Sequence, residues 1–214
     1  MSFATQTQEQ RAISLLRRQG MARLSEFKKA GITAATLSRM TGKGIVLRLG
    51  RGLYQLADAE LDANHSLAEA AKLVPKGTIC LVSALAYHGL TDTIPARVWV
   101  AIGTRDRRPT IAYPPLQVVR FNDKVLRTGI EQHVIEGVPV KIYSPAKTVV
   151  DLFRYRKSQG RRYQNSTGLN LALEALREAL RKRQATPSEI ATFAHEAGIW
   201  KIIEPYLEAM IANA

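Results

Sequence analysis

The chain has 214 residues, with 31 Lys and Arg against 18 Asp and Glu and a formal net charge of +13, which favours a polyanion or an acidic protein as partner. The single cysteine, Cys80, excludes an internal disulfide and lies in an apolar run, where we expect it to be buried and inert. No apolar run reaches the roughly 18 to 20 residues of a membrane span, and the N-terminus lacks a secretory pattern, so we expect a cytoplasmic protein without a membrane partner.

The first predicted elements are two short helices. Residues 8–18 predict an opening helix, because Ile13 and Leu16 are three residues apart and Gly20 follows as a C-terminal stop. A second helix is predicted from about Leu24 to Ala30, where apolar residues recur every third position. Gly31 tolerates a positive φ angle and ends that helix.

A third helix and a hairpin follow. Thr33 is a favourable N-cap, and the helix behind it places Leu37 and Met40 on one face, so that Thr36, Arg39 and Lys43 should point elsewhere and remain free. Two apolar runs around the turn Gly50–Gly52 predict a two-stranded wing, with Arg48 and Arg51 at or near its tip. Together these elements predict a winged helix-turn-helix over residues 1–58.

The charge of this segment indicates its partner. Residues 1–58 contain ten Lys and Arg against three acids. A single helix fits the major groove of DNA and a wing can lie along the neighbouring backbone, so phosphates are the expected counter-charge. The alternative is a small basic module that binds protein.

An acid-bearing passage, residues 57–64, separates this segment from the rest, and we place a second domain at residues 64–214. Its expected elements are helices over residues 66–74 and about 83–89, the second with Ser83 as a cap, strands over residues 97–102, 116–121 and 138–143, and helices beginning at Ser144, Leu169, Thr186 or Ser188, and Trp200. The predicted fold class is α+β: an N-terminal winged helix-turn-helix followed by a larger mixed α+β domain ending in helices.

No catalytic or metal motif stands out, and we expect no cofactor and no metal. The histidines His65, His88, His133 and His195 are scattered, which favours structural or solvated roles. Lys147 precedes Asp151 by four residues, a spacing for an ion pair within a helix, or alternatively for an acid and lysine site. A basic run beyond this helix is either a solvated face or a docking surface for nucleic acid or an acidic protein, and consists of Arg154, Arg156, Lys157, Arg161 and Arg162.

Three sequence blocks support a family resemblance. GITAATLSRMTGKGIVLRLGRGLYQL, SALAYHGLTDTIPARVWVAI and YSPAKTVVDLFRYRKSQG, in this order, resemble the AbiEi-type antitoxins of type IV toxin-antitoxin systems. The resemblance implies an N-terminal domain that binds inverted repeats upstream of its operon and represses it. It also implies a C-terminal domain that counteracts a nucleotidyltransferase-like toxin, a system associated with phage defence, without requiring a stable complex between the two proteins.

The resemblance and the charge pattern together give the candidate residues. The expected DNA-binding residues are Arg23, Lys28, Thr33, Thr36, Arg39, Lys43, Arg48 and Arg51. Among them, Arg39 and Thr36 should reach bases, whereas Lys43, Arg48 and Arg51 should hold the backbone. The C-terminal signature, to which no role is assigned, comprises Ser83, His88, Ser144, Lys147 and Asp151.

The expected function is therefore that of an autoregulating antitoxin and not that of an enzyme. Two alternatives stay open: a ligand-responsive transcriptional regulator without a toxin, and an α+β enzyme that uses Asp151, Lys147 and His88.

Overall fold

A computed structural model describes residues 6–156 and 167–212. The chain forms two compact units. The first comprises residues 1–75, 109–114 and 133–140, and the second comprises residues 76–108, 115–132 and 141–214. Among the described residues, no helix has both the length and the apolar character to cross a membrane.

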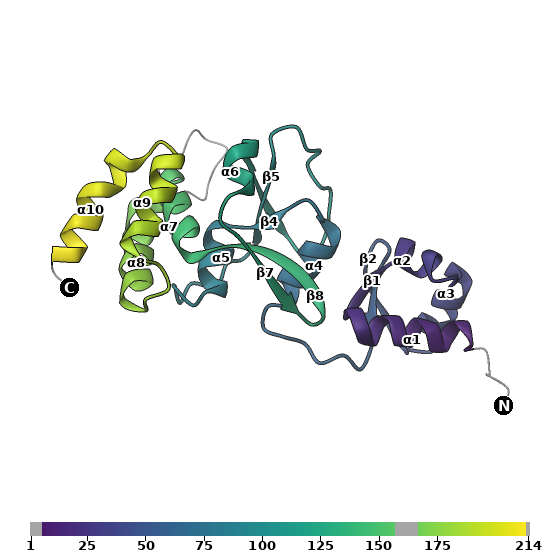
Figure 1. Ribbon diagram of the computed structural model, residues 1–214. Coiled ribbons are helices and arrows are strands. Elements are labelled where there is room, and N and C mark those ends of the chain that lie inside the picture. Colours follow the sequence, from purple (N-terminus) through teal and green to yellow (C-terminus); the bar gives the residue numbers. More distant parts are fainter. Residues whose placement is uncertain (1–5, 157–166, 213–214) are drawn as a thin grey trace, which may run out of the picture. The chain divides into compact units, whose positions relative to one another are not determined.

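The first unit is a winged helix-turn-helix extended by one helix (Figure 1). Its elements are α1 (Gln8–Gln19), β1 (Met21–Arg23), α2 (Leu24–Lys29), α3 (Ala34–Gly42), β2 (Val46–Gly50), β3 (Leu53–Leu56) and α4 (His65–Leu73). The three strands form an antiparallel sheet in the order β1-β3-β2. The predicted winged helix-turn-helix is confirmed, and the short strand β1 is an addition to it.

Local chemistry sets the ends of these helices. The Thr7 side chain accepts a hydrogen bond from the backbone of Gln10 and begins α1. Thr33 caps α3 in the same way, as predicted. Gly20 and Gly31 have φ angles of 65° and 69°, a conformation that costs glycine little, and they end α1 and α2. The apolar faces then close over one core, formed mainly by Ala12, Leu15, Leu16, Phe27, Ile32, Leu37, Met40 and Val46.

The second unit is built on most of a five-stranded mixed sheet with strand order β6-β5-β4-β8-β7. The strands of this sheet and the helices between them are β4 (Thr78–Ile79), α5 (Leu81–Tyr87), β5 (Val98–Gly103), β6 (Leu116–Phe121), α6 (Asp123–Arg127), β7 (Ile130–Ile135) and β8 (Val138–Tyr143), of which the parts of β7 and β8 within residues 133–140 belong to the first unit. Strand β5 runs parallel to β6 and antiparallel to β4. The predicted α+β class is confirmed.

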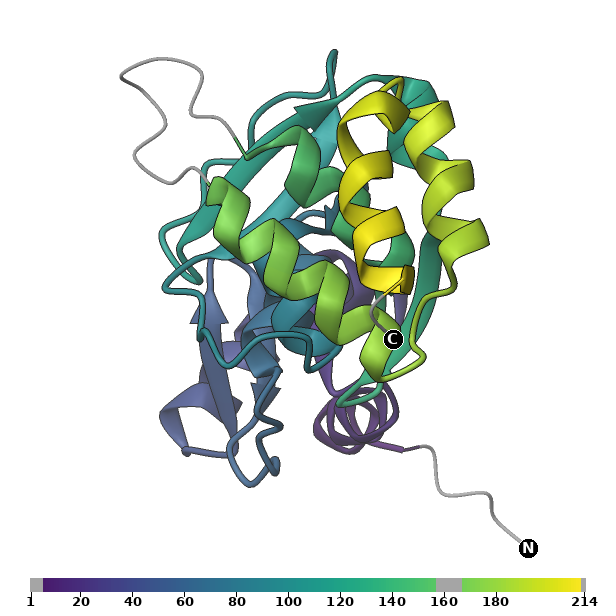
Figure 2. The ribbon, with the colours of Figure 1, turned by 90° about the vertical axis from the view of Figure 1, so that its left-hand side faces the viewer.

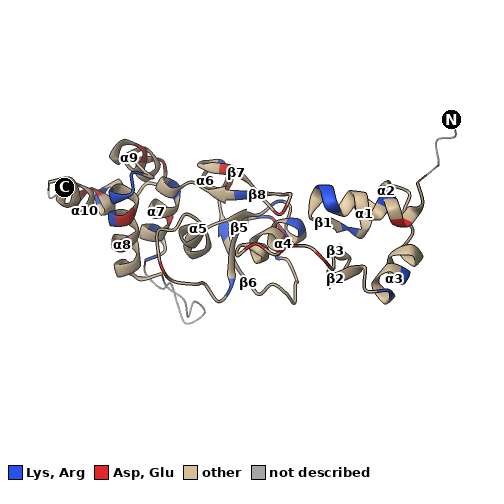
Figure 3. Cartoon of the chain, turned by 90° about the horizontal axis from the view of Figure 1, so that it is seen from below, with Lys and Arg blue, Asp and Glu red and all other residues tan. Residues whose placement is uncertain are grey.

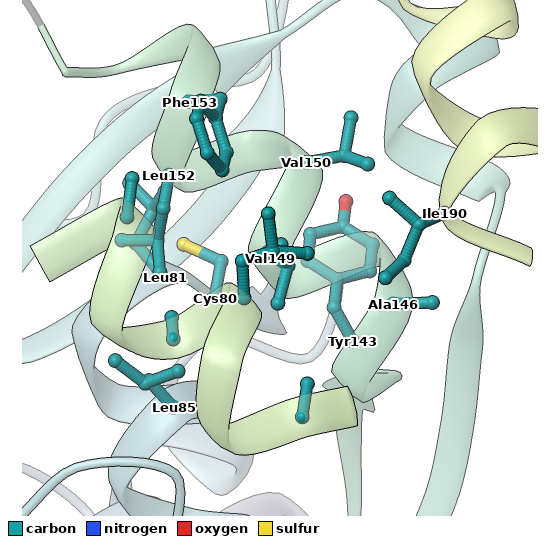
Figure 4. Packing of buried hydrophobic residues seen from close by; sticks show 14 of the residues in the cluster. Cys80, Leu81, Leu85, Tyr143, Ala146, Val149, Val150, Leu152, Phe153 and Ile190 are labelled. Carbon is teal, nitrogen blue, oxygen red and sulfur yellow. The ribbon is translucent and has the colours of Figure 1, made fainter. Parts of the chain in front are cut away.

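Helices complete the C-terminal half. They are α7 (Pro145–Arg154), α8 (Gly168–Arg181), α9 (Pro187–Glu196) and α10 (Trp200–Ala212). The last three lie together at one end of the unit (Figures 1 and 2). Every residue of α7 from Pro145 to Phe153 is buried, so α7 is the central helix of this core. Figure 4 shows its side chains Val149 and Val150 among the apolar groups around Cys80 and Tyr143.

Some predictions for the second unit need correction. The helix α5 begins after Cys80, so Ser83 lies inside the helix and is not its cap. The elements β4, α6 and β7 were not predicted. Strand β4 has two residues and α6 has five, which is too short for a periodic signal, and β7, with the sequence IEQHVI, has three consecutive polar residues that break the alternation of a half-buried strand.

Candidate nucleic-acid interface

The helix α3 exposes one face of small side chains and one arginine. Leu37 and Met40 are fully buried and attach the helix to the core of the first unit. The opposite face exposes Ala35, Ser38 and Arg39. A face of small residues lets the helix approach a duplex closely, and a long guanidinium beside it can still reach base edges. Ala35 and Ser38 were not among the predicted contacts, although the helical spacing from Leu37 and Met40 places them outward.

Thr36 differs from its prediction. It was expected to be free, but it is only 2% exposed. Its hydroxyl donates to Gln8 Oε1 at 2.7 Å and lies 3.1 Å from the hydroxyl of Thr33. Gln8 of α1 also accepts hydrogen bonds from the backbone and side chain of Thr33. Thr36 therefore fastens the start of α3 to α1, and a side chain so engaged is not available to a base.

Arg39 is exposed and is the reading side chain that this arrangement positions. One guanidinium nitrogen donates to the hydroxyl of Thr36 over 3.3 Å. A chain of hydrogen bonds thus runs from Gln8 through Thr36 to Arg39. The guanidinium has five N–H groups, so this single contact leaves most of them for a ligand.

Lys43, at the end of α3, forms an ion pair with Glu9 of α1, with 3.1 Å between Nζ and Oε1. The side chain of Lys43 is 56% exposed, so water screens this pair. A phosphate could replace Glu9 as the partner of the ammonium group at small cost.

The wing presents two further arginines. Arg51 is exposed in the turn between β2 and β3. Arg48 is also exposed, and its Nε donates to the carbonyl of Gly50 over 3.3 Å, next to an irregularity in the strand pairing between Arg48 and Gly50. Both side chains can extend toward a phosphate backbone.

The two remaining predicted DNA-binding residues of the first unit, Lys28 and Arg23, differ in exposure. Lys28 is exposed near the end of α2. Arg23 is partly buried, and its backbone N–H donates to Glu26 Oε2 at 2.7 Å at the start of α2. Arg11 was not singled out by sequence, yet its guanidinium donates to the carbonyls of Ala30 and Gly31 over 3.2 and 3.4 Å. Arg11 therefore supports the turn before α3. Figure 3 shows basic residues of this unit on α1 and α3, among other elements.

The signature residues of the second unit contain a buried ion pair. Lys147 Nζ lies 2.5 Å from Asp151 Oδ2, and the two residues are 2% and 0% exposed. The ammonium group also lies 4.6 Å from the ring centre of Tyr143 and 5.0 Å from that of Phe121, distances typical of cation–π contacts. Burial raises the pKa of Asp151, and the positive charge of Lys147 opposes this rise. The ion pair expected from the spacing of these residues is present.

The other signature residues bind backbone atoms around the same core. The Ser83 hydroxyl accepts a hydrogen bond from the Trp99 backbone at 2.9 Å. His88 Nε2 lies 2.8 Å from the Tyr143 carbonyl oxygen. Ser144 caps α7 as predicted. These contacts connect α5 to β5 and β8, so Ser83 and His88 have structural roles.

Of the predicted basic run after α7, Arg154 is exposed, and Arg156 donates to the carbonyl of Phe153 at 2.7 Å. Lys157, Arg161 and Arg162 lie outside the described residues.

Among the histidines, His65 pairs with Glu136 at 2.9 Å and His195 stacks on Trp200 with 4.8 Å between ring centres. Within residues 6–156 and 167–212, no group of three or more His, Cys, Asp or Glu is arranged to hold a metal ion.

Comparison with known proteins relates this architecture to others. The fold is similar to that in the crystal structure of the RV2827C protein from Mycobacterium tuberculosis, with a TM-score of 0.59 and 13% sequence identity, covering 97% of this chain and 81% of that chain. No curated protein matches. A family model described as transcriptional regulator, AbiEi antitoxin, which is not a class of enzymes, matches residues 10–57. The match runs from α1 through the wing, so the resemblance to AbiEi antitoxins predicted from the sequence is confirmed over the winged helix-turn-helix.

Proposed function

We propose that this protein is an antitoxin of a type IV toxin-antitoxin system that represses its own operon. Residues 1–58 bind inverted repeats in the operator, and residues 64–214 counteract a nucleotidyltransferase-like toxin in the cytoplasm. The observation that carries the proposal is the exposed face of α3, with Arg39 beside small residues and an arginine at the wing tip, within the segment that matches the AbiEi transcriptional regulators.

Repression follows from occupancy of the operator. Arg39 can donate two hydrogen bonds to the major-groove edge of a guanine, and the methyl group of Ala35 can contact a thymine methyl. Lys43, Arg48 and Arg51 neutralise phosphates and thereby contribute affinity more than sequence preference. Thr36 orients Arg39 in place of reading a base itself, because its hydroxyl is buried and occupied. Two copies of the chain on an inverted repeat double the length of DNA that is covered.

The DNA-binding half of the proposal is tested with the full chain and its own upstream region. Arg39→Gln should weaken binding to the operator by about 1 to 3 kcal/mol and leave binding to shuffled DNA of the same length almost unchanged. The matched control is Arg177→Gln, which removes an exposed arginine on α8. Equal affinity of the unmodified protein for operator and shuffled DNA at two salt concentrations would contradict the proposal.

The antitoxin half is tested by growth rescue. Cells express the neighbouring nucleotidyltransferase-like reading frame together with either the unmodified chain or Arg39→Gln from an independent promoter. Both should restore growth, while only the unmodified chain should silence a reporter placed behind the operator. Failure of the unmodified chain to restore growth at normal protein levels would leave a transcriptional regulator without a toxin.

The enzyme alternative is disfavoured by burial. Lys147 and Asp151 are 2% and 0% exposed, and a catalytic group must touch its substrate. Their ion pair is better explained as part of the core.

A further inference from the structure

A second group of cations gathers in the second unit, at the ends of β5 and β6. These two strands are parallel, with Gly103 opposite Phe121, so the segments that follow them leave the sheet at the same edge. Figure 1 shows α6 and the segment after β5 at this end of the sheet. The cations gathered there are Lys76, Arg105, Arg107, Arg108, Arg120, Lys124 and Arg127.

Hydrogen bonds from Arg120 of β6 and within the turn itself support the turn that follows β5. A single nitrogen of Arg120 donates to the carbonyls of Gly103, Thr104 and Asp106 at 3.0, 2.7 and 2.8 Å. The Asp106 carboxylate accepts a hydrogen bond from the Gly103 backbone at 2.9 Å and lies 3.9 Å from the ammonium group of Lys76. The Asp106 carboxylate therefore has two partners already, the backbone N–H of Gly103 and the ammonium group of Lys76.

Three arginines project from this turn. Arg105, Arg107 and Arg108 are exposed, and none of them forms an ion pair with another described residue. All three lie within residues 105–108, so three positive charges are concentrated on one short exposed segment. Such a concentration of like charges is unfavourable by itself and is relieved by an anion.

The end of α7 reaches the same edge. The Tyr155 hydroxyl donates to the carbonyl of Arg120 over 3.4 Å, and its ring lies 5.7 Å from that of Phe121 between centres. Arg154 and Arg156 are the sequence neighbours of Tyr155, so their backbone lies at this edge, and we count both cations with the group. The fold thus unites two basic segments that are far apart in the sequence, and we call these nine cations the basic edge.

The composition of the basic edge distinguishes between two kinds of partner. Its only acids are Asp106 and Asp123, and no large hydrophobic side chain is exposed within it; the exposed ones among the described residues are Leu47, Leu61, Ile94, Tyr113, Val134 and Ile211. Protein interfaces depend on apolar anchors at their centre, whereas binding to a phosphate backbone can be driven by cations alone. Arginine, which makes up seven of the nine cations, is also suited to bidentate contact with phosphate.

We propose that the basic edge is a second nucleic-acid site, which binds the phosphodiester backbone without sequence preference and is independent of α3 and the wing. The site increases the affinity of the protein for any nucleic acid that it holds, and it makes this binding more dependent on salt. It does not read bases, because its cations come from several short segments, namely the turn after β5, the end of β6, the five-residue helix α6 and the end of α7, and no single helix presents them together to a groove.

The test compares two triple variants of the full chain that remove the same charge. Arg105→Gln, Arg107→Gln and Arg108→Gln remove the arginines of the turn, and the control changes Arg177, Arg183 and Lys201, which are exposed on or next to α8 and α10, to Gln. Both are made in a Lys43→Gln, Arg48→Gln and Arg51→Gln background, which removes the proposed phosphate contacts of the winged helix-turn-helix and so weakens it as a competing site. Unchanged unfolding temperatures establish that both variants are folded.

The probes are duplex DNA of random sequence, duplex RNA and single-stranded RNA of equal length, followed by fluorescence anisotropy over a range of salt. The turn variant should lose at least about tenfold in affinity at low salt, and the salt slope on duplex DNA should fall by about 2 to 3, as expected for three lost phosphate contacts. The probe whose affinity falls most identifies the kind of nucleic acid that the basic edge binds. The proposal is overturned if the control variant loses as much as the turn variant, or if neither loses affinity.

Discussion

Two cations of this protein, Arg39 in the first unit and Lys147 in the second, are placed in opposite ways. Arg39 is exposed and touches the Thr36 hydroxyl, while Lys147 is 2% exposed and bound to the carboxylate of Asp151. The sequence predicts Arg39 as a base contact, but for Lys147 it leaves open an ion pair or an acid and lysine site. Burial separates them: an exposed cation is available to a ligand, and a buried one is committed to its partner.

The energetic consequences also differ. An exposed pair such as Lys43 with Glu9 contributes roughly 0 to 1 kcal/mol, so exchange of its partner for a phosphate is nearly neutral. The pair of Lys147 and Asp151 cannot be divided without leaving a charge in an apolar core. The exposed cations on α3 and the wing are therefore available for binding, whereas α7 uses Lys147 for folding.

The largest expected effect comes from dividing the buried pair. Asp151→Asn leaves Lys147 without its counter-charge and should lower the free energy of unfolding by about 3 to 5 kcal/mol. Urea unfolding followed by circular dichroism measures this loss. Operator affinity, measured well below the unfolding midpoint, should change little.

The control removes both charges together. Lys147→Met combined with Asp151→Leu replaces the pair by apolar groups of similar size and should recover most of the lost stability. If the double variant were as unstable as the single one, the uncompensated charge could not be the cause of the loss.

A smaller effect separates two neighbours on α3. Thr36→Ala removes a buried hydroxyl bonded to Gln8 and should cost about 1 to 2 kcal/mol of stability. Ser38→Ala, on the exposed face, should leave the unfolding midpoint unchanged and alter operator affinity only. Equal stability of the two variants, measured by urea unfolding, would contradict the assignment of Thr36 as a buried support.

The winged helix-turn-helix could be predicted because its signals are local. Gly20 and Gly31 take the positive φ angles that end α1 and α2, and Thr33 caps α3 through its own side chain. Each of these signals depends on residues within one or two turns. The start of α7 at Ser144 and Pro145 was predictable for the same reason.

The site could be predicted less completely, because it depends on long-range contacts. The burial of Thr36 is caused by Gln8, which lies 28 residues earlier in the sequence, and no local pattern reports it. Ser38 and Ala35 could have been found by extending the helical spacing of Leu37 and Met40. The basic edge depends on β5 and β6 being parallel neighbours, which strand patterns alone do not specify.

A further contrast concerns a buried acid of the first unit. Glu69 of α4 is 2% exposed, and one of its oxygens has no hydrogen-bond partner among the described residues. Burial raises its pKa, which the nearby His65 partly opposes and Glu136 reinforces. A carboxyl group whose pKa is raised on folding contributes stability below its ordinary pKa, and this contribution is lost as the pH rises through the raised value.

Glu69→Gln should prevent this loss of stability at higher pH, because the amide stays neutral at every pH. The variant should be more stable than the unmodified protein by about 1 kcal/mol near pH 7, and the difference should shrink toward zero below about pH 4. Urea midpoints at four pH values measure this dependence. A difference that stays constant with pH would mean that the carboxylate charge is not responsible.

The smallest expected effect compares two cations of the binding face itself. Arg51 is exposed at the wing tip, whereas Lys43 must give up Glu9 before it can hold a phosphate. Arg51→Gln should therefore reduce the salt slope of operator binding by about 0.9, the value for one phosphate contact on duplex DNA. Lys43→Gln should reduce the slope by the same amount but lower the affinity less, because the free protein also loses its ion pair. Glu9→Gln provides the control, since it frees Lys43 in advance and should raise affinity slightly, an increase that must disappear when Lys43 is also replaced.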